Sequence, residues 1–350
     1  MKYFSLVFAF GFLSLSSCSK KTNNNNPVSP PPVDTTTVPV DTSSFARGAD
    51  VSWVTQMESQ GIKFYSKNGT QQDLFQILKD DGMNSIRLRV WVNPPAGWCN
   101  TADVVTKSLR AKAAGMKILI DFHYSDTWAD PGDQTTPAAW QNQTITQLDS
   151  SVNAYTTGVL DTLKLNGISP DWVQVGNETN DGMLWPEGRA SVSMANFASL
   201  INAGYDAVKS VFPSTKVIVH ISNGFDNTLF RWMFDGLQSN GAKWDVIGMS
   251  LYPTDSNWTQ LNAQCVANMN DMVSRYNKEV MICEVGMSVS DSMPCNNFIS
   301  DLIQKSESIP NNKCLGVFYW EPECYNGWSG YMLGAFNNQG QPTVALNAFN

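Results

Sequence analysis

Short apolar runs, rich in β-branched and aromatic residues, recur along the chain and alternate with stretches of helical period. Each run is continuous enough to be buried on both faces, as the strands of a parallel sheet are. There are eight such runs after residue 44, at residues 46–53, 85–92, 117–124, 172–178, 216–222, 246–252, 280–286 and 316–322. This repeated alternation constrains the fold more than any other feature of the sequence.

Two α/β architectures accommodate such an alternation, a doubly wound sheet and a closed barrel. A doubly wound sheet that binds nucleotides carries a glycine-rich fingerprint after its first strand, and no such fingerprint follows the run ARGADVSW. The count of eight favours a single (β/α)8 TIM barrel over residues 45–350, with helices such as those predicted at residues 73–83, 104–116 and 194–212. In this fold the active site lies at the C-terminal ends of the strands.

Polar and aromatic side chains gather at the ends of the predicted strands. They are Asp50, Trp53, Arg87, Arg89, Trp91, Asp121, His123, Asn177, Glu178, His220, Tyr252, Glu284, Trp320 and Glu321. Packing alone does not account for such a ring, because charged side chains are almost never fully buried unless they are paired. The sequence therefore predicts a polar site at one mouth of the barrel.

Two glutamates at this mouth suggest a chemistry. Glu178 ends the fourth run and Glu284 ends the seventh, and these two strands face each other across an eight-stranded barrel. Hydrolysis of a glycosidic bond needs one carboxylic acid to protonate the leaving oxygen and one carboxylate to meet the anomeric carbon. A single glutamate is explained equally well as the partner of an arginine, but the pair, with Asn177 beside one member and Tyr252 available to the other, favours glycoside hydrolysis.

Several neighbours of the two glutamates have two interpretations. Arg89 either serves the site or neutralises Asp50 or Asp121 at the barrel mouth. Of the two histidines, His123 taken alone is more often a hydrogen-bonded structural imidazole than an acid–base group, and its best functional role is a hydrogen bond to the substrate. His220 has the same two interpretations, with more weight on the structural one. Indole faces stack on sugar rings, so we expect at least two of the tryptophans near strand ends to be sugar platforms; these are Trp91, Trp98, Trp128, Trp185 and Trp320.

The first 44 residues differ from the rest of the chain. An early lysine followed by an apolar run at residues 3–15 is typical of an export signal. The run is too short to span a bilayer. The run ends in LSSC, which resembles a bacterial lipobox in which Cys18 becomes the lipidated N-terminus; an ordinary cleaved signal peptide is the alternative. Residues 19–44 are predicted to be a disordered polar tether. We therefore expect an exported lipoprotein, anchored to a membrane at the cell surface or in the periplasm.

The charge and the cysteine content of the chain limit the kinds of partner that the protein is expected to bind. The formal net charge is −8, and the 23 Lys and Arg residues are dispersed, so nucleic acid is not expected as a partner. Twelve tryptophans suit flat, weakly polar ligands such as sugars. Beyond Cys18 there are six cysteines, whose spacing matches no zinc signature and does not fix a disulfide pairing. We expect a monomer.

Six motifs carry a resemblance to a known family. They are GADVSW, IRLRVWVNP, DFHYSDTWADPG, WVQVGNETNDGMLWPEG, GMSLYP and the glutamate of VMICEVG. Over residues 45–349 the chain resembles glycoside hydrolase family 53, the endo-β-1,4-galactanases of clan A, and the third and fourth motifs are long and specific. The resemblance implies retaining endo-hydrolysis of β-1,4-galactan, as in pectic side chains, on a (β/α)8 barrel without a required cofactor.

The resemblance also implies residue roles. Glu178 is expected to be the general acid/base and Glu284 the nucleophile, with Asn177 bonding the substrate 2-hydroxyl. Tyr252 is expected to hold the nucleophile and Arg89 to support its charge. The residues expected to contact substrate are Asp50, Arg89, Trp91, Asp121, His123, Trp128, Asn177, Asp181, Trp185, Tyr252 and Trp320, with the last as the floor of a subsite.

The sequence departs from the family after the seventh run, where Thr and an aromatic residue usually follow the glutamate. Here the segment 284–288 reads EVGMS. We therefore do not predict a sugar contact on the loop after the seventh run. Some bacterial relatives bind structural calcium in a loop near the eighth strand, but no clear run of ligands stands here, and the metal is left open.

Two alternative functions remain. The first is a non-catalytic glycan-binding barrel at the cell surface, which the presence of both Glu178 and Glu284 argues against. The second is another clan A endo-hydrolase, such as a β-mannanase or a cellulase. The motifs DFHYSDTWADPG and NDGMLWPEG argue against it, since they belong to the galactanase resemblance.

Overall fold

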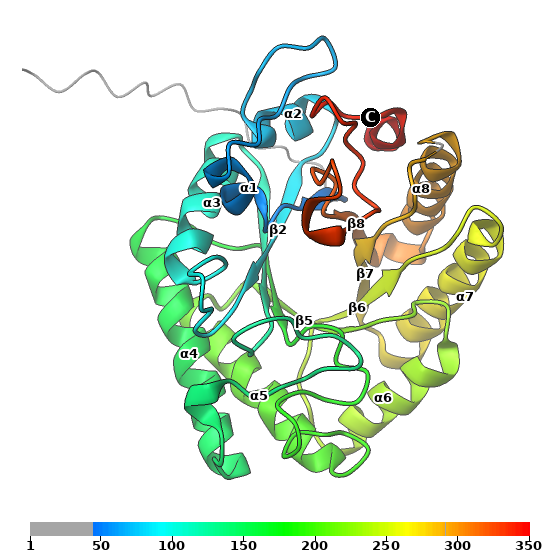
Figure 1. Cartoon of the computed structure of the whole chain (residues 1–350). Coiled ribbons are helices and arrows are strands. Elements are labelled where there is room, and N and C mark those ends of the chain that lie inside the picture. Colours follow the sequence, from blue (N-terminus) through cyan, green and yellow to red (C-terminus); the bar gives the residue numbers. More distant parts are fainter. Residues whose placement is uncertain (1–44, 291) are drawn as a thin grey trace, which may run out of the picture. The chain divides into compact units, whose positions relative to one another are not determined.

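The computed structural model describes residues 45–290 and 292–350. In this part of the chain eight parallel strands form a closed barrel in chain order, with the last strand paired to the first (Figure 1). The strands are β1 (Ala46–Asp50), β2 (Ser85–Val90), β3 (Lys117–Phe122), β4 (Trp172–Val175), β5 (Lys216–Ile221), β6 (Val246–Leu251), β7 (Glu279–Val285) and β8 (Cys314–Trp320). The predicted (β/α)8 TIM barrel is confirmed. Cys18 and the predicted tether lie outside the described residues.

Helices connect the strands on the outside of the barrel (Figure 1). They are α1 (Val54–Ser59), α2 (Leu74–Asp80), α3 (Thr101–Ala113), α4 (Ile145–Leu165), α5 (Met194–Val211), α6 (Asn227–Ser239), α7 (Trp258–Tyr276) and α8 (Ser292–Glu307). Short 3-10 helices lie at Ala138–Trp140, Pro310–Asn312, Trp328–Gly330 and Val344–Phe349. None of the described helices combines the length and the hydrophobicity that a membrane crossing requires.

Local sequence signals explain where several helices begin and end. A short polar side chain caps the first turn of α2, α3, α5 and α6 by accepting a backbone N–H; the capping residues are Asp73, Asn100, Ser193 and Asp226. A glycine with positive φ follows α2, α3, α4 and α6, at Gly82, Gly115, Gly167 and Gly241. These stops deliver the chain to the N-terminal end of the next strand.

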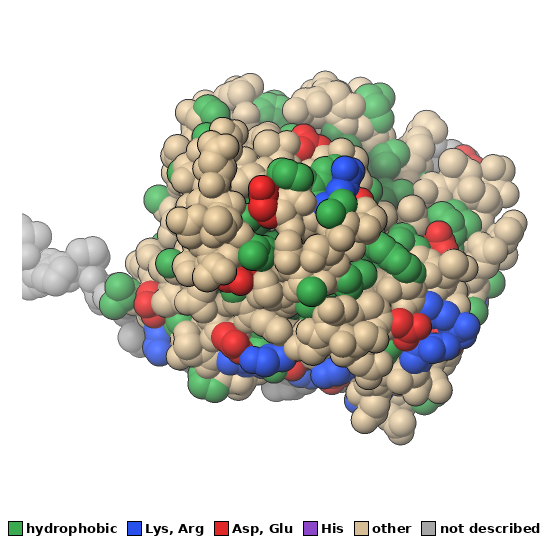
Figure 2. Space-filling view, turned by 90° about the horizontal axis from the view of Figure 1, so that it is seen from below, with side chains coloured by type: hydrophobic (Ala, Val, Ile, Leu, Met, Phe, Trp, Pro, Cys, Tyr) green, Lys and Arg blue, Asp and Glu red, His purple; other side chains and the backbone are tan. Residues whose placement is uncertain are grey.

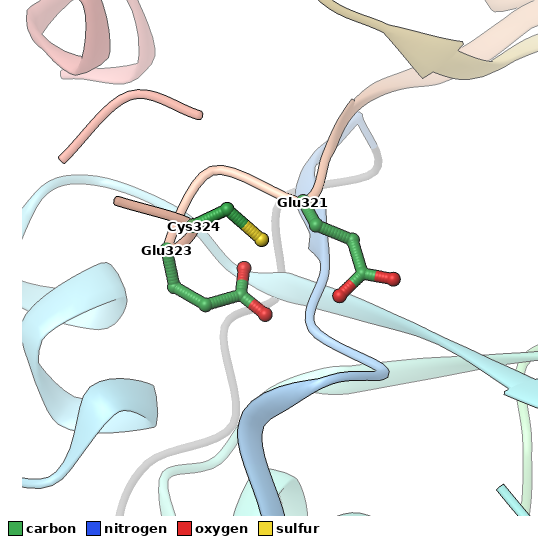
Figure 3. A group of neighbouring side chains, drawn as sticks. All are labelled: Glu321, Glu323 and Cys324. Carbon is green, nitrogen blue, oxygen red and sulfur yellow. The ribbon is translucent and has the colours of Figure 1, made fainter. Parts of the chain in front are cut away.

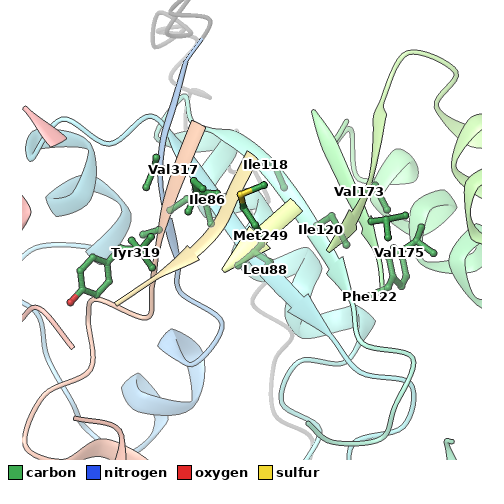
Figure 4. Close-up of a cluster of buried hydrophobic side chains, with 14 of the residues drawn as sticks. Ile86, Leu88, Ile118, Ile120, Phe122, Val173, Val175, Met249, Val317 and Tyr319 are labelled. Carbon is green, nitrogen blue, oxygen red and sulfur yellow. The ribbon is translucent and has the colours of Figure 1, made fainter. Parts of the chain in front are cut away.

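Alternating side chains of the strands fill two apolar layers. One set points outward and packs under the helices; Figure 4 labels Ile86, Leu88, Ile118, Ile120, Phe122, Val173, Val175, Met249, Val317 and Tyr319 of this set. The other points into the barrel, where Leu119, Ile218, Met281 and Phe318 belong to a second buried cluster. Phe318 fits there because position 48 is glycine, whose added Cβ would lie 2.2 Å from the Phe318 ring. Apolar residues thus fill the barrel interior below the polar strand ends.

An irregularity in β7 affects the site directly. The register between β6 and β7 shifts between Met249 and Ser250, so that Met249 pairs with Ile282 and Ser250 with Glu284. Such a bulge re-aims the side chains that follow it. As a result Cys283 belongs to the interior cluster while its neighbour Glu284 still points into the barrel mouth.

The face shown in Figure 2 carries no continuous basic area. Lys and Arg side chains lie beside Asp and Glu on this face. Ion pairs such as Lys243–Asp206 and Arg231–Asp271, with N···O distances of 2.8 and 2.7 Å, show how basic groups are neutralised locally.

Candidate active site

A cavity of about 230 Å³ opens at the C-terminal ends of the strands. Its lining consists of His123, Trp128, Ala129, Asp130, Asn177, Glu178, Tyr252, Glu284 and Trp320. The two predicted catalytic glutamates therefore share one cavity, although 106 residues separate them. A larger hollow of about 530 Å³ lies between the loops that follow β7 and β8 and contains neither glutamate. We therefore assign the chemistry to the smaller cavity.

Backbone geometry aims Glu178 into the cavity. Beyond the end of β4 both Gly176 and Glu178 have positive φ, 81° and 44°. A residue with a side chain occupies this region at a cost of about 1–3 kcal/mol, and only where its surroundings hold it there. Thr179 does so, because its backbone N–H and its hydroxyl both donate to the carbonyl of His220, at 2.9 and 3.0 Å.

Each carboxylate oxygen of Glu284 has a partner, one in an ion pair and one in a hydrogen bond. Oε1 lies 2.9 Å from Nη2 of Arg87, and Oε2 accepts from the hydroxyl of Tyr252 at 2.8 Å. Charge-assisted contacts of this kind are among the strongest in proteins, and they favour the ionised carboxylate. These two contacts orient the carboxyl group of Glu284 and favour its ionised form, against the burial that raises its pKa to about 8.

Glu178 has a different set of contacts. Its Oε1 accepts from the hydroxyl of Ser250 at 2.6 Å, and Nε2 of His220 lies 2.8 Å from that hydroxyl. Because burial holds the pKa of His220 well below its ordinary value, the imidazole is neutral and donates from Nε2 to Ser250. Glu178 therefore contacts a neutral hydroxyl where Glu284 contacts a guanidinium.

This difference separates the roles of the two carboxyl groups. Burial raises the pKa of both Glu178 and Glu284. At Glu284 the direct contacts with Arg87 and Tyr252 oppose that effect. We therefore place the proton that the pair shares on Glu178. The cavity then holds one acid and one carboxylate, the combination that glycoside cleavage requires.

Arg87 is the charged centre beneath the cavity. It is fully buried on β2, and its guanidinium pairs with Asp50 at 2.7 Å, with Asp121 at 2.9 Å and with Glu284 at 2.9 Å. It also donates to the side-chain oxygen of Asn177 at 2.9 Å. Asp50 and Asp121 are completely buried partners of Arg87 and do not line the cavity, so the structure gives them no substrate contact.

Arg89 lies elsewhere, and the expectation that it supports the charge of Glu284 is wrong. Its Nη1 pairs with Glu321 at 2.8 Å. Its guanidinium carbon lies 4.1 Å from the ring centroid of Trp128 and 4.9 Å from that of Trp91. Arg89 therefore supports the tryptophans at the cavity, while Arg87 is the arginine that pairs with Glu284.

His123 lines the cavity, but both of its ring nitrogens have protein partners. Nε2 lies 2.9 Å from the carboxylate of Asp121, and Nδ1 accepts from the backbone N–H of Ala129 at 3.1 Å. The hydrogen bond that we expected from His123 to the substrate is therefore not available in this structure. His220 is fully buried among polar partners, in agreement with the structural role favoured by the sequence.

Aromatic side chains form one wall of the cavity. The rings of Trp128 and Trp320 are 5.9 Å apart at 68°. Buried Trp53 lies 5.4 Å from each of them and fixes both from behind. Trp91 packs on Trp128 at 5.2 Å but is not part of the lining. The structure therefore leaves Trp128 and Trp320 as the two indoles in the best position to meet a sugar.

Two predicted contact residues bind their own loop. Asp181 accepts from Nε of Arg189 at 2.9 Å and from the backbone N–H of Ser191 at 2.7 Å. Trp185 donates from its indole to the carbonyl of Asp181 at 2.9 Å, and the guanidinium of Arg189 lies 4.0 Å from its ring. Both residues organise the β4–α5 loop and lie outside the cavity lining.

Three further residues serve the site and were not identified from the sequence. Ser250 donates to Glu178; Gln174 donates to Asp121 at 2.6 Å and to Asn177 at 3.0 Å. Tyr331 packs on Trp320 at 4.7 Å. The first two interrupt the apolar runs VIGMSLY and WVQVGNE with a polar residue, which was the available signal. Tyr331 lies in a loop with no such pattern.

Near the eighth strand, the acidic side chains that lie close together do not match the calcium site left open by the sequence. Among the described residues one group of three metal-binding side chains lies there, Glu321, Glu323 and Cys324. Calcium takes six to eight oxygen ligands, whereas this group offers two carboxylates and a thiol. These residues therefore do not fit calcium.

Comparison with known proteins agrees with this geometry. The model of Glycosyl hydrolase family 53 matches residues 46–349. The chain belongs to glycosyl hydrolase family 53. The predicted membership is thereby confirmed, and the matched region contains the whole barrel.

Several known proteins are similar to this chain. A probable arabinogalactan endo-β-1,4-galactanase A of Neosartorya fischeri is 38% identical over 79% of this chain and 83% of its own length. The arabinogalactan endo-β-1,4-galactanase of Thermothelomyces thermophilus is 34% identical over 87% of this chain and 98% of its own length. A solved fungal β-1,4-galactanase superposes with a TM-score of 0.80 at 32% identity, over 88% and 99%. The GH53 catalytic domain of Ignisphaera aggregans superposes with a TM-score of 0.80 at 31% sequence identity, over 93% of this chain and 99% of its own.

The contacts of this family 53 site predict how its activity depends on pH. The Tyr252 hydroxyl stabilises ionised Glu284, so Tyr252→Phe should raise the pKa of Glu284. The acid limb of the kcat/KM profile, along which Glu284 becomes protonated, should then move to higher pH by about 1 unit. Tyr205→Phe is the control, because that hydroxyl contacts Asp245 at 3.3 Å on the outer surface. An acid limb that stays in place or moves to lower pH would contradict the assignment.

Proposed function

We propose that the protein is a retaining endo-β-1,4-galactanase that cleaves the galactan chains of type I arabinogalactan to galacto-oligosaccharides. One observation carries the proposal: two carboxyl groups share one cavity, and only Glu284 contacts a guanidinium. The names of the relatives in family 53 support the choice of substrate. No cofactor enters the proposed reaction.

In the proposed mechanism Glu284 attacks the anomeric carbon while Glu178 protonates the leaving oxygen. A covalent glycosyl-enzyme forms, and Glu178 then takes a proton from the water that hydrolyses it. This double displacement needs carboxyl groups about 5–5.5 Å apart, and it predicts a first product that retains the β configuration. Proton NMR of that product measures the configuration directly, and an α product would point to inversion.

The proposed substrate follows from the shape of the chain as well as from the relatives. A β-1,4-linked galactose leaves through an axial 4-oxygen, so the polymer curves where a cellulose chain is straight. Half-buried Trp128 and Trp320 meet at 68°, and two indoles at this angle suit sugar units on either side of a bend. Neutral sugars also suit a site whose charged groups are already paired.

Activity on a panel of polysaccharides tests the substrate. Unbranched β-1,4-galactan, carboxymethyl-cellulose, mannan and β-1,3-galactan are compared at equal mass, and both reducing ends and viscosity are followed. The proposal expects the fastest turnover on β-1,4-galactan, with an early fall in viscosity that marks internal cleavage. Faster turnover on another polymer would identify a different clan A activity, and monomeric galactose as the sole early product would exclude endo-cleavage. Tight binding without release of reducing ends would identify a glycan-binding barrel.

We also propose that Cys18 is lipidated and anchors the exported protein to a membrane. The LSSC sequence after an apolar run and the polar composition of residues 19–44 support this. Cys18→Ala should move the protein from the membrane fraction to the soluble fraction without loss of activity, because the tether precedes the barrel. Fractionation of this variant tests the anchor, with Cys314→Ser as a second cysteine variant that should stay in the membrane fraction. Equal membrane retention of the Cys18→Ala protein would exclude the lipid anchor.

A further inference from the structure

A group of three buried side chains follows β8 and has no part in the proposed hydrolysis. Glu321 and Glu323 are fully buried, and Cys324 is 2% exposed. Figure 3 shows their side-chain ends pointing toward one space beside the turn. One atom from each residue, a carboxylate oxygen or Sγ, lies within 4.8 Å of the others. Three groups that can ligate a metal thus converge inside the protein.

Glu323 lacks a partner within the part of the chain that the structure describes. Both of its carboxylate oxygens are buried without a hydrogen-bond partner there. The polar groups beside its carboxyl group are its own backbone N–H and the carboxyl group of Glu321, which is another acceptor; burial together with Glu321 raises the pKa of Glu323 well above its ordinary value. A buried carboxyl group of this kind costs several kcal/mol unless a cation or a proton neutralises it.

The nearby arginines are already paired. Arg89 contacts Glu321, and the second oxygen of Glu321 accepts from the backbone N–H of Trp53 at 2.8 Å. Arg87 pairs with Asp50, Asp121 and Glu284. The Nε and Nη2 atoms of Arg89 are buried without a hydrogen-bond partner, but no ion pair joins Arg87 or Arg89 to Glu323. A proton or a bound cation therefore has to neutralise Glu323.

The backbone holds the three residues in place before any ion binds. The N–H of Cys324 donates to the carbonyl of Glu321 at 3.3 Å, and the N–H of Ala335 donates to the carbonyl of Pro322 at 2.7 Å. Gly334 packs directly on this turn, where an added Cβ would lie 1.8 Å from the carbonyl oxygen of Cys324. Cys324 also lines the hollow of about 530 Å³ between the loops after β7 and β8, which provides an entry path.

We propose that Glu321, Glu323 and Cys324 bind one divalent ion of the zinc class. Zn²⁺ accepts thiolate and carboxylate ligands together and is four-coordinate, so a water or the second oxygen of Glu323 completes the site. Calcium and magnesium prefer oxygen ligands alone. On binding, the ion replaces the protons of Cys324 and Glu323. It ties the turn after β8 beneath Trp320, a structural role that does not depend on the proposed hydrolysis.

Metal uptake by the full chain tests the site without relying on any variant. Protein without a histidine tag is stripped with a strong chelator and titrated with Co²⁺, whose thiolate complexes absorb in the near ultraviolet. One Co²⁺ per chain should produce this absorption, and Zn²⁺ should displace it. Zn²⁺ should also raise the thermal midpoint of the stripped protein by several degrees, whereas Ca²⁺ and Mg²⁺ should not.

Two substitutions and a matched control locate the ion. Cys324→Ser should abolish the thiolate absorption, and Glu323→Gln should weaken uptake at least tenfold. Cys314→Ser is the control, because Cys314 is equally buried but lies at the other end of β8 and should leave uptake unchanged.

Three results would overturn the proposal. Wild-type protein that takes up no Co²⁺ and gains no stability from Zn²⁺ would show that a proton neutralises Glu323. A thiolate absorption that survives Cys324→Ser would place the ion elsewhere. A stabilisation by Ca²⁺ equal to that by Zn²⁺ would exclude a thiolate ligand. None of these results depends on whether the protein cleaves galactan, so the two proposals fail separately.

Discussion

Replacement of Glu284 by glutamine should lower the turnover of every substrate by about 10⁴-fold or more, because the proposed mechanism forms its covalent bond to this carboxylate. The loss should not depend on the leaving group. An aryl galactoside with an easily expelled phenol still needs a nucleophile at the anomeric carbon. Initial rates on galactan and on a series of aryl substrates measure this directly.

The fold should survive the Glu284→Gln substitution. Arg87 keeps its ion pairs with Asp50 and Asp121, so its charge stays compensated. Glu279→Gln is the matched control, because Glu279 lies at the opposite end of the same strand and pairs with Lys216 at 2.6 Å. Thermal unfolding of both variants separates a chemical loss from a structural one. A Glu284→Gln protein that retains more than about 1% of its activity would exclude Glu284 as the nucleophile.

The barrel could be predicted from the sequence because its strands are buried on both faces. Such strands read as continuous apolar runs, and each of the eight predicted runs coincides with one strand. The predictions erred at the C-terminal ends. β4 ends at Val175 rather than at Glu178, because Gly176 and Glu178 take positive φ and leave the ladder. The residues that end the strand early are those that build the site.

The sequence analysis expected Arg89 beside Glu284, whereas the structure places Arg87 there. The sequence of β2 alone does not distinguish the two arginines. Arg87 and Arg89 are two residues apart on β2, and side chains alternate between the faces of a strand, so both arginines lie on the same face. Which one meets Glu284 depends on the stagger of the strands around the barrel and on the bulge in β7. Neither the stagger nor the bulge can be read from the residues of β2.

The loops limited the prediction of substrate contacts in a similar way. Asp181 and Trp185 stand in a long loop after β4, where an aromatic residue and an acid suggest a rim for the substrate. The structure shows that Arg189, only a few residues further along, satisfies both. A side chain in a loop can bind its own loop or a ligand, and composition alone does not distinguish the two.

Replacement of Glu178 by glutamine should divide the substrates into two classes. On galactan the leaving group is a sugar hydroxyl that needs a proton, so turnover should fall by about 10²–10⁴-fold. On aryl galactosides with acidic phenols the first step needs no proton and should remain fast. The second step still lacks its base, so a burst of phenol equal to the enzyme concentration should precede slow hydrolysis.

Azide adds a positive test of the same assignment, because this anion attacks the glycosyl-enzyme without a base. With Glu178→Gln it should restore steady turnover of the aryl substrate and release a β-galactosyl azide, since two displacements retain configuration. Glu187→Gln, in the same β4–α5 loop but outside the cavity lining, is the matched control and should behave as wild type. An equal loss on both substrate classes, or an α-azide product, would contradict the role of Glu178. Glu178 contacts the Ser250 hydroxyl, which neutral His220 holds, whereas Glu284 contacts Arg87. The structure therefore predicts that only the Glu178 variant shows this rescue.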